Sequence, residues 1–250
     1  MEQVHPVAAA GFTAGADVYE RARPTYPAEA VAWLAERLGL GPGRTVVDVG
    51  AGTGKLTRLL VPFGARVIAV EPLPAMREKL REAVPGTEAM AGTAESLPLP
   101  DSSADGITVA QAMHWFDQSR ALPELRRVLR PTGALGLIWN VRDLRDPLQE
   151  RLDALLAPER AKVPSQLQQG WREPLESSEL FGPLEERRFP HVQLCTVEDV
   201  CDRVSSTSFV AAMDDADRGA LLDRVRALLA GLAEPFPFRY EAEVYVAPAL

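Results

Sequence analysis

Residues 46–55 read VVDVGAGTGK, and this stretch decides the fold. The apolar, β-branched run at its start is typical of a buried parallel strand. It passes directly into three alternating glycines, Gly50, Gly52 and Gly54, which allow a sharp turn and let a ligand approach the backbone closely. The next apolar residues are spaced as on one face of a helix, which predicts a helix over residues 53–63. The stretch therefore predicts a strand, a glycine turn and a helix in succession.

An acidic residue follows the next predicted strand. Residues 66–70 (RVIAV) form a second apolar run, and Glu71 comes immediately after it. In a parallel sheet this position lies at the carboxyl end of the strand beside the glycine turn. A carboxylate there accepts hydrogen bonds from ribose hydroxyls. Strand, turn, helix, strand and acid together indicate a ligand that contains a ribose.

Three classes of ligand compete for this arrangement. A nucleoside triphosphate needs GxxxxGK[ST], and here Gly50 and Gly54 are too close together and Leu56 follows Lys55. A dinucleotide prefers GxGxxG, whereas the spacing here is GxGxG. S-adenosylmethionine has no phosphate and needs only the close approach and the ribose acid. The spacing favours S-adenosylmethionine as the cofactor and leaves a dinucleotide as the alternative.

Further apolar runs alternate with helical patterns along the chain. Strands are predicted at residues 45–49, 66–70, 106–110 and 134–139. Helical patterns precede or separate them at residues 31–38, 76–83 and 121–130. This alternation predicts an α/β fold, a Rossmann-like, doubly wound and mostly parallel sheet with helices on both faces.

The chain is expected to form a single domain over residues 1–250 in three parts. Residues 1–40 would supply N-terminal lid helices, residues 41–141 the cofactor-binding core, and residues 142–250 substrate-side helices and the last strands. In this third part, helices are predicted after Asp146, from a capping box at Thr196, and over residues 221–232. Strands are predicted at residues 184–189 and 239–246, and a long loop at residues 157–180.

Composition excludes several classes of protein. The chain has 250 residues, 25% charged and 46% hydrophobic, which is ordinary for a soluble globular protein. A formal net charge of -8 gives no overall attraction to nucleic acid, and none is expected as a partner. Without a secretory signal or a membrane-spanning stretch, a cytoplasmic location is expected. The two cysteines are expected to be free and buried, and the three scattered histidines predict no metal site.

Residues 44–140 resemble class I S-adenosylmethionine-dependent methyltransferases, specifically the large type 11 group. The matching segments occur in order: VVDVGAGTGKLT, VIAVEP, AGTAESLPLPDSSAD, VAQAMHWFD and RVLRPTGALGLIWN. The N-terminal YERARPTYP is similar to bacterial members, including trans-aconitate methyltransferase-like relatives. The C-terminal hundred residues match only loosely, so the resemblance does not name an acceptor.

The resemblance implies a cofactor site, position by position. The glycine turn would pass under the methionine part, Glu71 would hold the ribose, and the residues after the second, third and fourth strands would meet the adenine and methionine. The implied cofactor residues are Tyr19, Arg23, Gly50, Ala51, Gly52, Thr53, Leu56, Glu71, Pro72, Met76, Thr93, Ala94, Glu95, Gln111 and Ala112.

Several of these positions have a purely structural alternative. Asp48 either supports the glycine turn by hydrogen bonds or contacts the ligand. Met76 either contacts the adenine or belongs to the core, and Pro72 either flanks the adenine or starts a helix. Lys55 is expected to be a solvated helix residue.

The substrate side is expected where His114, Trp115 and Phe116 follow the fourth strand. His114 either takes a proton from an acceptor hydroxyl, as the catalytic base, or holds the loop by bonding a backbone carbonyl. A carboxylate acceptor needs no base, and arginines such as Arg23 or Arg142 would anchor it. The substrate-side candidates are Tyr26, His114, Trp115 and Asn140.

The sequence thus predicts an enzyme that transfers a methyl group from S-adenosylmethionine to an oxygen, carboxylate or carbon of a small molecule by in-line displacement. Two alternatives stay open. One is a protein that binds S-adenosylmethionine without methyl transfer, such as a regulator or a cyclase. The other is a nucleic-acid methyltransferase, although the chain lacks a DPPY or NPPY motif and a cysteine in a catalytic loop.

Overall fold

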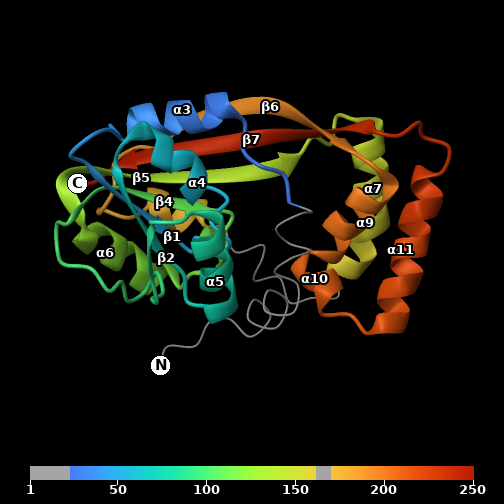
Figure 1. The fold of residues 1–250 in the computed structure, drawn as a ribbon, viewed down its shortest axis with the longest axis horizontal. Helices are drawn as coiled ribbons and strands as arrows, with labels where there is room; N and C mark the ends of the chain where they lie inside the picture. The colour runs from blue at the N-terminus through green and yellow to red at the C-terminus, as the bar shows by residue number, and fades with distance from the viewer. Residues whose placement is uncertain (1–22, 162–169) are drawn as a thin grey trace.

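A seven-stranded sheet forms the centre of the protein (Figure 1). The computed structural model describes residues 23–161 and 170–250. The strands lie in the order β3-β2-β1-β4-β5-β7-β6. Their bounds are Thr45–Val49 (β1), Arg66–Val70 (β2), Glu88–Met90 (β3), Ala104–Ala110 (β4), Leu129–Arg142 (β5), Glu185–Cys195 (β6) and Phe236–Pro248 (β7). β1 to β5 pair in parallel, and β7 is antiparallel to both β5 and β6. The predicted Rossmann-like, mostly parallel sheet is confirmed.

The order of the strands reverses beside β1. Val47 pairs with Ile68 of β2 on one side and with Ile107 of β4 on the other. All three side chains are buried, because helices cover both faces of a parallel sheet. A crevice opens at the carboxyl ends of the strands where the order reverses, and ligands of open α/β sheets bind there. The glycine turn that follows β1 starts at this point.

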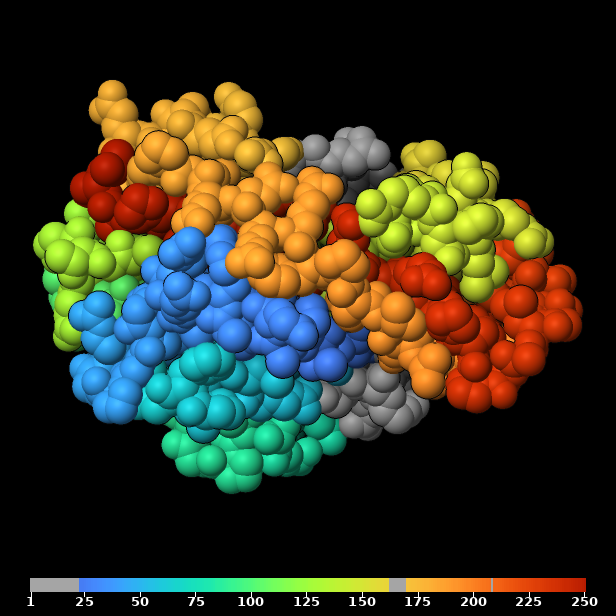
Figure 2. All heavy atoms as spheres, turned by 90° about the horizontal axis from the view of Figure 1, so that it is seen from above, coloured from blue at the N-terminus to red at the C-terminus, as the bar shows by residue number. Residues whose placement is uncertain are grey.

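Helices pack on both faces of the sheet. They are α3 (Ala28–Arg37), α4 (Thr57–Leu60), α5 (Pro74–Ala83), α6 (Gln118–Val128) and α8 (Arg172–Glu176). Figure 2 shows α3 lying beside β6, where Trp33 and Phe189 have ring centroids 6.3 Å apart. Gly136 permits the close approach of α3, because a Cβ there would stand 2.4 Å from Leu34 Cδ1.

A group of helices lies beyond the end of β5 and the start of β7 (Figure 1). We call it the helical group: α7 (Pro147–Arg160), α9 (Val197–Ser205), α10 (Ser208–Ala211) and α11 (Asp215–Leu229). It shares an apolar core with the first residues of β7, Phe236 and Phe238. Cys195 and Cys201 belong to the same core and are free and buried, as predicted. The group therefore stands at the carboxyl edge of the sheet.

The predicted helix starts in this region are confirmed. Asp146 accepts hydrogen bonds from the amides of Leu148 and Gln149 at the start of α7. Thr196 and Asp199 form the reciprocal capping box of α9. Caps are local features, so a few neighbouring residues determine them.

Other boundaries were predicted wrongly. Residues 157–180 are not one long loop, because α7 continues to Arg160 and α8 forms at Arg172–Glu176; residues 162–169 lie outside the described part. The helix after the glycine turn begins at Thr57 rather than residue 53 and ends in a 3-10 turn at Val61–Phe63, which contains Pro62. In the described ranges no helix combines the length and hydropathy needed to cross a bilayer.

Candidate functional site

The glycine turn after β1 leaves its backbone open on one side. The amides of Gly50 and Ala51 donate to Val70 O at 2.8 and 3.2 Å, which fixes the turn to the end of β2. Gly50 and Gly52 have φ angles of 68° and 57°, a region that favours glycine. A Cβ on Gly50 would stand 2.9 Å from Ala112 Cβ, whereas one on Gly52 would meet nothing within 4 Å. Gly50 is thus needed for packing, and the open side of the turn is at Gly52.

Glu71 lies against this turn. Its Oε2 accepts the amide of Gly52 at 2.9 Å, and its Oε1 accepts the amide of Leu73 at 2.9 Å. The residue is only 6% exposed. Burial raises the pKa of this carboxyl, and the two amide donors oppose the rise. A carboxylate offers about four lone-pair sites, so each oxygen can accept a further hydrogen bond from a ligand.

Asp48 lies on the strand that precedes the glycine turn. It is fully buried on β1, and its two oxygens accept hydrogen bonds from Thr57 Oγ1 at 2.6 Å and Thr108 Oγ1 at 3.0 Å. Burial raises the pKa of Asp48 to about 6, and the threonine hydrogen bonds oppose the rise. The carboxylate therefore ties β1 to β4 and to the helix after the turn. Its partners are the two hydroxyl groups and the backbone of Thr57, which lie outside the glycine turn itself.

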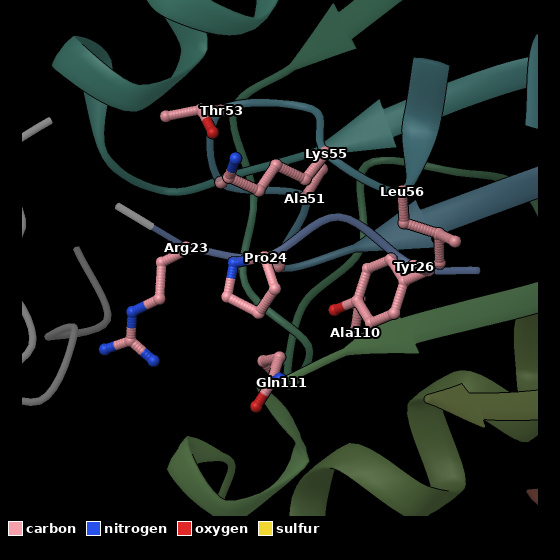
Figure 3. Close-up of a pocket in the computed structure, with 11 residues that line it drawn as sticks. Arg23, Pro24, Tyr26, Ala51, Thr53, Lys55, Leu56, Ala110 and Gln111 are labelled. Atoms are coloured by element: carbon pink, nitrogen blue, oxygen red, sulfur yellow. The ribbon is translucent and has the colours of Figure 1, made fainter. Parts of the chain in front are cut away.

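A hollow of about 420 Å³, partly open to solvent, lies beside the turn (Figure 3). Its lining includes predicted cofactor and substrate residues: Arg23, Tyr26, Gly50, Ala51, Gly52, Thr53, Leu56 and Gln111. It also includes Pro24, Lys55 and Ala110, which were not predicted as site residues. Lys55 precedes α4 and lies in the turn itself, so the expectation of a solvated helix residue was wrong. Ala110, the last residue of β4, could have been found from its place at a strand end.

Gln111 occupies a strained position at the end of β4. Its φ is 55°, which for a residue with a side chain costs on the order of 1–3 kcal/mol. The strained backbone is held by the Gln111 amide, which donates to Ile138 O at 3.0 Å, and by Nε2, which donates to Asn140 O at 3.3 Å. This conformation brings Gln111 into the lining of the hollow.

The residues expected near the adenine follow β2 and β3 in the chain. The Glu71 amide donates to Met90 O at 3.1 Å, so the segment after β3 starts beside it. Met76 is buried in the first turn of α5, which begins just after Pro72. In the segment at residues 93–95, Ala94 is buried, Thr93 bridges to Ser96, and Glu95 Oε1 accepts the amide of Asp117 at 2.9 Å. Contact with adenine stays a prediction for Pro72, Met76, Thr93, Ala94 and Glu95.

His114 lies in a 3-10 turn, Met113–Trp115, directly after β4. Burial lowers the pKa of its imidazole to about 4, and the charge of Arg23 adds to the effect. The ring is therefore neutral at pH 7. Its centroid is 5.0 Å from that of Trp115, which packs against the core. His114 and Trp115 are not part of the lining given above, and their roles stay predictions.

Asn140 binds the segment before α3 at the carboxyl edge of the sheet. Its Nδ2 donates to Pro24 O at 3.3 Å and to Thr25 O at 3.2 Å, and its Oδ1 is 2.8 Å from His191 Nε2. The side-chain amide is thus engaged by protein partners, and contact with a substrate stays a prediction. His191 was missed because only the antiparallel pairing of β6 and β7 brings it to this edge.

The opposite end of the same segment reaches the helical group. Arg23 Nε donates to Ser206 Oγ at 3.1 Å, and Nη2 donates to Ser206 O at 2.8 Å. Tyr26 is buried and lines the hollow. Residues 23–26 therefore cross from the helical group to the sheet beside the hollow. Tyr19, the remaining predicted residue, lies outside the described residues.

The seven-stranded sheet, with a glycine turn after β1 and an acid after β2, fits the class I S-adenosylmethionine-dependent methyltransferases. Comparisons identify the family. The profile of the family described as "Methyltransferase domain" matches residues 47–137. An uncharacterized methyltransferase of Mycobacterium tuberculosis is 41% identical over 234 residues, covering 90% of this chain and 91% of that protein. The chain therefore belongs to this methyltransferase family.

Solved structures agree with this assignment. A structure described as a type II methyltransferase from Anaeromyxobacter dehalogenans has a TM-score of 0.66 at 27% identity, covering 90% of this chain and 97% of that one. A phosphoethanolamine N-methyltransferase of Haemonchus contortus, solved with S-adenosylhomocysteine, shares the fold with a TM-score of 0.57 at 14% identity; the match covers 99% of this chain and 60% of that one.

Proposed function

We propose that this enzyme transfers a methyl group from S-adenosylmethionine to a small-molecule acceptor, with the cofactor held between the glycine turn and Glu71. The observation that carries the proposal is the contact between Glu71 and Gly52. The buried acid bonds the amide of the turn residue whose Cβ position is open. A ligand seated there meets bare backbone and a carboxylate together. A ribose with two hydroxyl donors suits that combination.

The same contact argues against a dinucleotide. The amide of Gly52 already donates to Glu71, so it is not available to a phosphate oxygen. The carboxylate charge would also repel a pyrophosphate placed beside it. S-adenosylmethionine carries no phosphate and has a positive sulfonium.

The remaining proposed cofactor contacts extend from this centre. Thr53 and Leu56 line the hollow beside the turn, and Gln111 lines it at the end of β4. The Ala112 Cβ lies next to the Gly50 backbone. We assign the methionine part of the cofactor to these residues and the adenine to the segments after β2 and β3.

When bound, S-adenosylmethionine supplies an electrophilic methyl group and departs as a neutral thioether. The chain therefore has no leaving group to protonate. Its tasks are to align the acceptor and to exclude water. Residues 23–26 are suited to the second task, because Asn140 holds the carbonyls of Pro24 and Thr25 and buried Tyr26 lines the hollow.

On the acceptor side we assign Tyr26, His114 and Trp115 to substrate contact and Asn140 to positioning. A base is most effective when its pKa lies near the working pH. With a pKa of about 4, His114 is a weak base that accepts a hydrogen bond from an acceptor hydroxyl more readily than it removes the proton.

Calorimetry on the full chain tests the cofactor assignment. S-adenosylmethionine and S-adenosylhomocysteine should both bind with a stoichiometry of about one per chain, and NADH should not bind. A screen of small acids, phenols and amines with methyl-labelled cofactor then tests methyl transfer. Binding of NADH in place of S-adenosylhomocysteine would refute the proposal.

A further inference from the structure

We propose that the acceptor carries a carboxylate and that Arg23, Arg142, Arg203 and Tyr240, the arginine cluster, bind it. This inference rests on the proposed function and adds the class of substrate. Among the residues that the structure describes, Arg142 Nη1, Arg203 Nε and Arg203 Nη1 are buried and have no hydrogen-bond partner. Buried charged donors are normally paired, so donors left without a partner point to a ligand.

Three separate parts of the fold bring the cluster together. Arg142 ends β5 and pairs in register with Tyr240 of β7. Arg203 lies in the last turn of α9, and Ser206, which binds the Arg23 guanidinium, caps that helix three residues later. Residues three apart lie on the same side of a helix. Burial raises the pKa of Tyr240 while the charges of Arg203 and Arg23 oppose the rise, so both guanidinium groups lie near the phenol.

The cluster has more positive than negative charge. Asp153 is shared, because it accepts hydrogen bonds from both Arg142 and Arg160. Arg203 forms no ion pair with any carboxylate in the described ranges. Burial lowers the pKa of Arg142, Asp153 opposes this, and the positive charge of Arg203 reinforces it. A negative group placed among these guanidinium groups would relieve this repulsion.

Arg23 connects the cluster to the proposed methyl-transfer site. It lines the hollow beside the glycine turn while its guanidinium binds Ser206 of the helical group. Figure 3 shows the Arg23 guanidinium extending away from the side of the hollow formed by Thr53 and Lys55. A small molecule anchored on the cluster through one end would therefore have its other end toward the hollow.

The surroundings favour a carboxylate over a phosphate. Phosphate sites commonly use the amides at a helix N-terminus, where the helix dipole is positive. Arg203 instead stands in the last turn of α9, where the dipole is negative and disfavours a single group that carries two negative charges. Planar guanidinium groups match carboxylate and phosphate alike, so the charge of the anionic group decides between them. A singly charged carboxylate satisfies these donors with the least repulsion from the helix end.

Binding of model anions to the full chain saturated with S-adenosylhomocysteine tests the proposal. The probes are succinate and citrate, the neutral analogue succinamide, and inorganic phosphate, measured by calorimetry and by thermal shift. The acids should bind and raise the melting temperature, and succinamide should not. Arg203→Met should weaken acid binding by at least about tenfold, the effect expected for losing a charge-assisted pair.

Two further measurements separate binding from folding. Without acid, Arg203→Met should melt close to the wild type, because two buried guanidinium nitrogens without a hydrogen-bond partner are removed, which offsets the loss of the hydrogen bond to Tyr240. Arg226→Met is the matched control, since Arg226 pairs with Glu198 on the surface of the helical group and should leave acid binding unchanged. S-adenosylhomocysteine affinity should be the same in all three proteins.

The outcomes are distinct. Equal acid binding by wild type and Arg203→Met, absence of acid binding, or phosphate binding more than about tenfold tighter than either acid would each overturn the carboxylate assignment. The acid titrations are repeated without S-adenosylhomocysteine. If S-adenosylhomocysteine fails to bind while acids still bind through Arg203, the proposed function fails and the anion site stands.

Discussion

Replacing Glu71 by alanine tests the centre of the proposed cofactor site. In the complex, this carboxylate would accept hydrogen bonds from the ribose while retaining those from Gly52 and Leu73. The residue is 6% exposed, so water screens these bonds little. Loss of two hydrogen bonds to a charged group, partly offset by water that enters the space, should cost about 2–3 kcal/mol. That corresponds to an affinity about 30- to 150-fold weaker for S-adenosylhomocysteine.

The effect on folding should be much smaller than the effect on binding. The variant leaves the Gly52 and Leu73 amides without their acceptor, which destabilises the fold. It also removes a carboxylate whose pKa is raised by burial, which stabilises the fold at neutral pH. Because the two contributions oppose each other, we expect the melting temperature to fall by only a few degrees.

Calorimetry and thermal melting on the same preparations measure both quantities. Glu78→Ala is the matched control, because Glu78 is an exposed acid on α5, which follows Glu71 in the chain. It should change neither value. The reasoning is refuted if Glu71→Ala binds S-adenosylhomocysteine as tightly as the wild type, or if Glu78→Ala loses as much affinity.

Three other predictions concern the residues around this centre. The folded-state pKa of Asp48 is raised to about 6, so its contribution to the free energy of unfolding falls as pH rises from 3.8 to about 6. Asp48→Asn should remove this decline, measured by denaturant unfolding at several pH values. The folded-state pKa of His114 is lowered to about 4, so the free energy of unfolding should fall by about 3 kcal/mol as pH drops from 6.5 toward 4. His114→Gln should flatten that part of the plot of unfolding free energy against pH. If either variant keeps the wild-type slope, the assignment for that residue is wrong. Asn140→Ala should speed amide hydrogen exchange in residues 23–26, and unchanged protection would show that other contacts hold this segment.

The central strands could be predicted from sequence because their determinants are local. β1 and β2 have the predicted bounds, since continuous apolar runs are bounded by a glycine turn and by Glu71. β3 was missed because it has three residues, and none of them is buried. β6 was predicted over residues 184–189, yet it extends over Glu185–Cys195. Its length is set by eleven pairs with β7, and such pairing between distant segments leaves no local pattern in the sequence.

The residues of the candidate site also divide into those with local determinants, which could be predicted, and those brought together only by folding. The glycine turn and Glu71 were predicted because the turn begins directly after β1 and Glu71 directly after β2. Arg203 and Tyr240 were not, because α9 and β7 meet only in the folded helical group. Asn140 was predicted as a substrate residue from its place after the apolar run of β5. Its bonds to Pro24 and Thr25 could not be predicted, because they depend on where a segment more than a hundred residues away returns to the sheet.

The short segment before α3 joins the two halves of the proposed site. At one end Arg23 binds Ser206 of the helical group, and two residues further Thr25 is held by Asn140 on the sheet. Between them, Pro24 lines the hollow. A displacement of the helical group relative to the sheet would therefore pull on this segment and change the shape of the hollow. Because an acid bound to Arg203 and Arg142 would bridge α9 and β5, acceptor binding and closure over the cofactor are expected to be coupled.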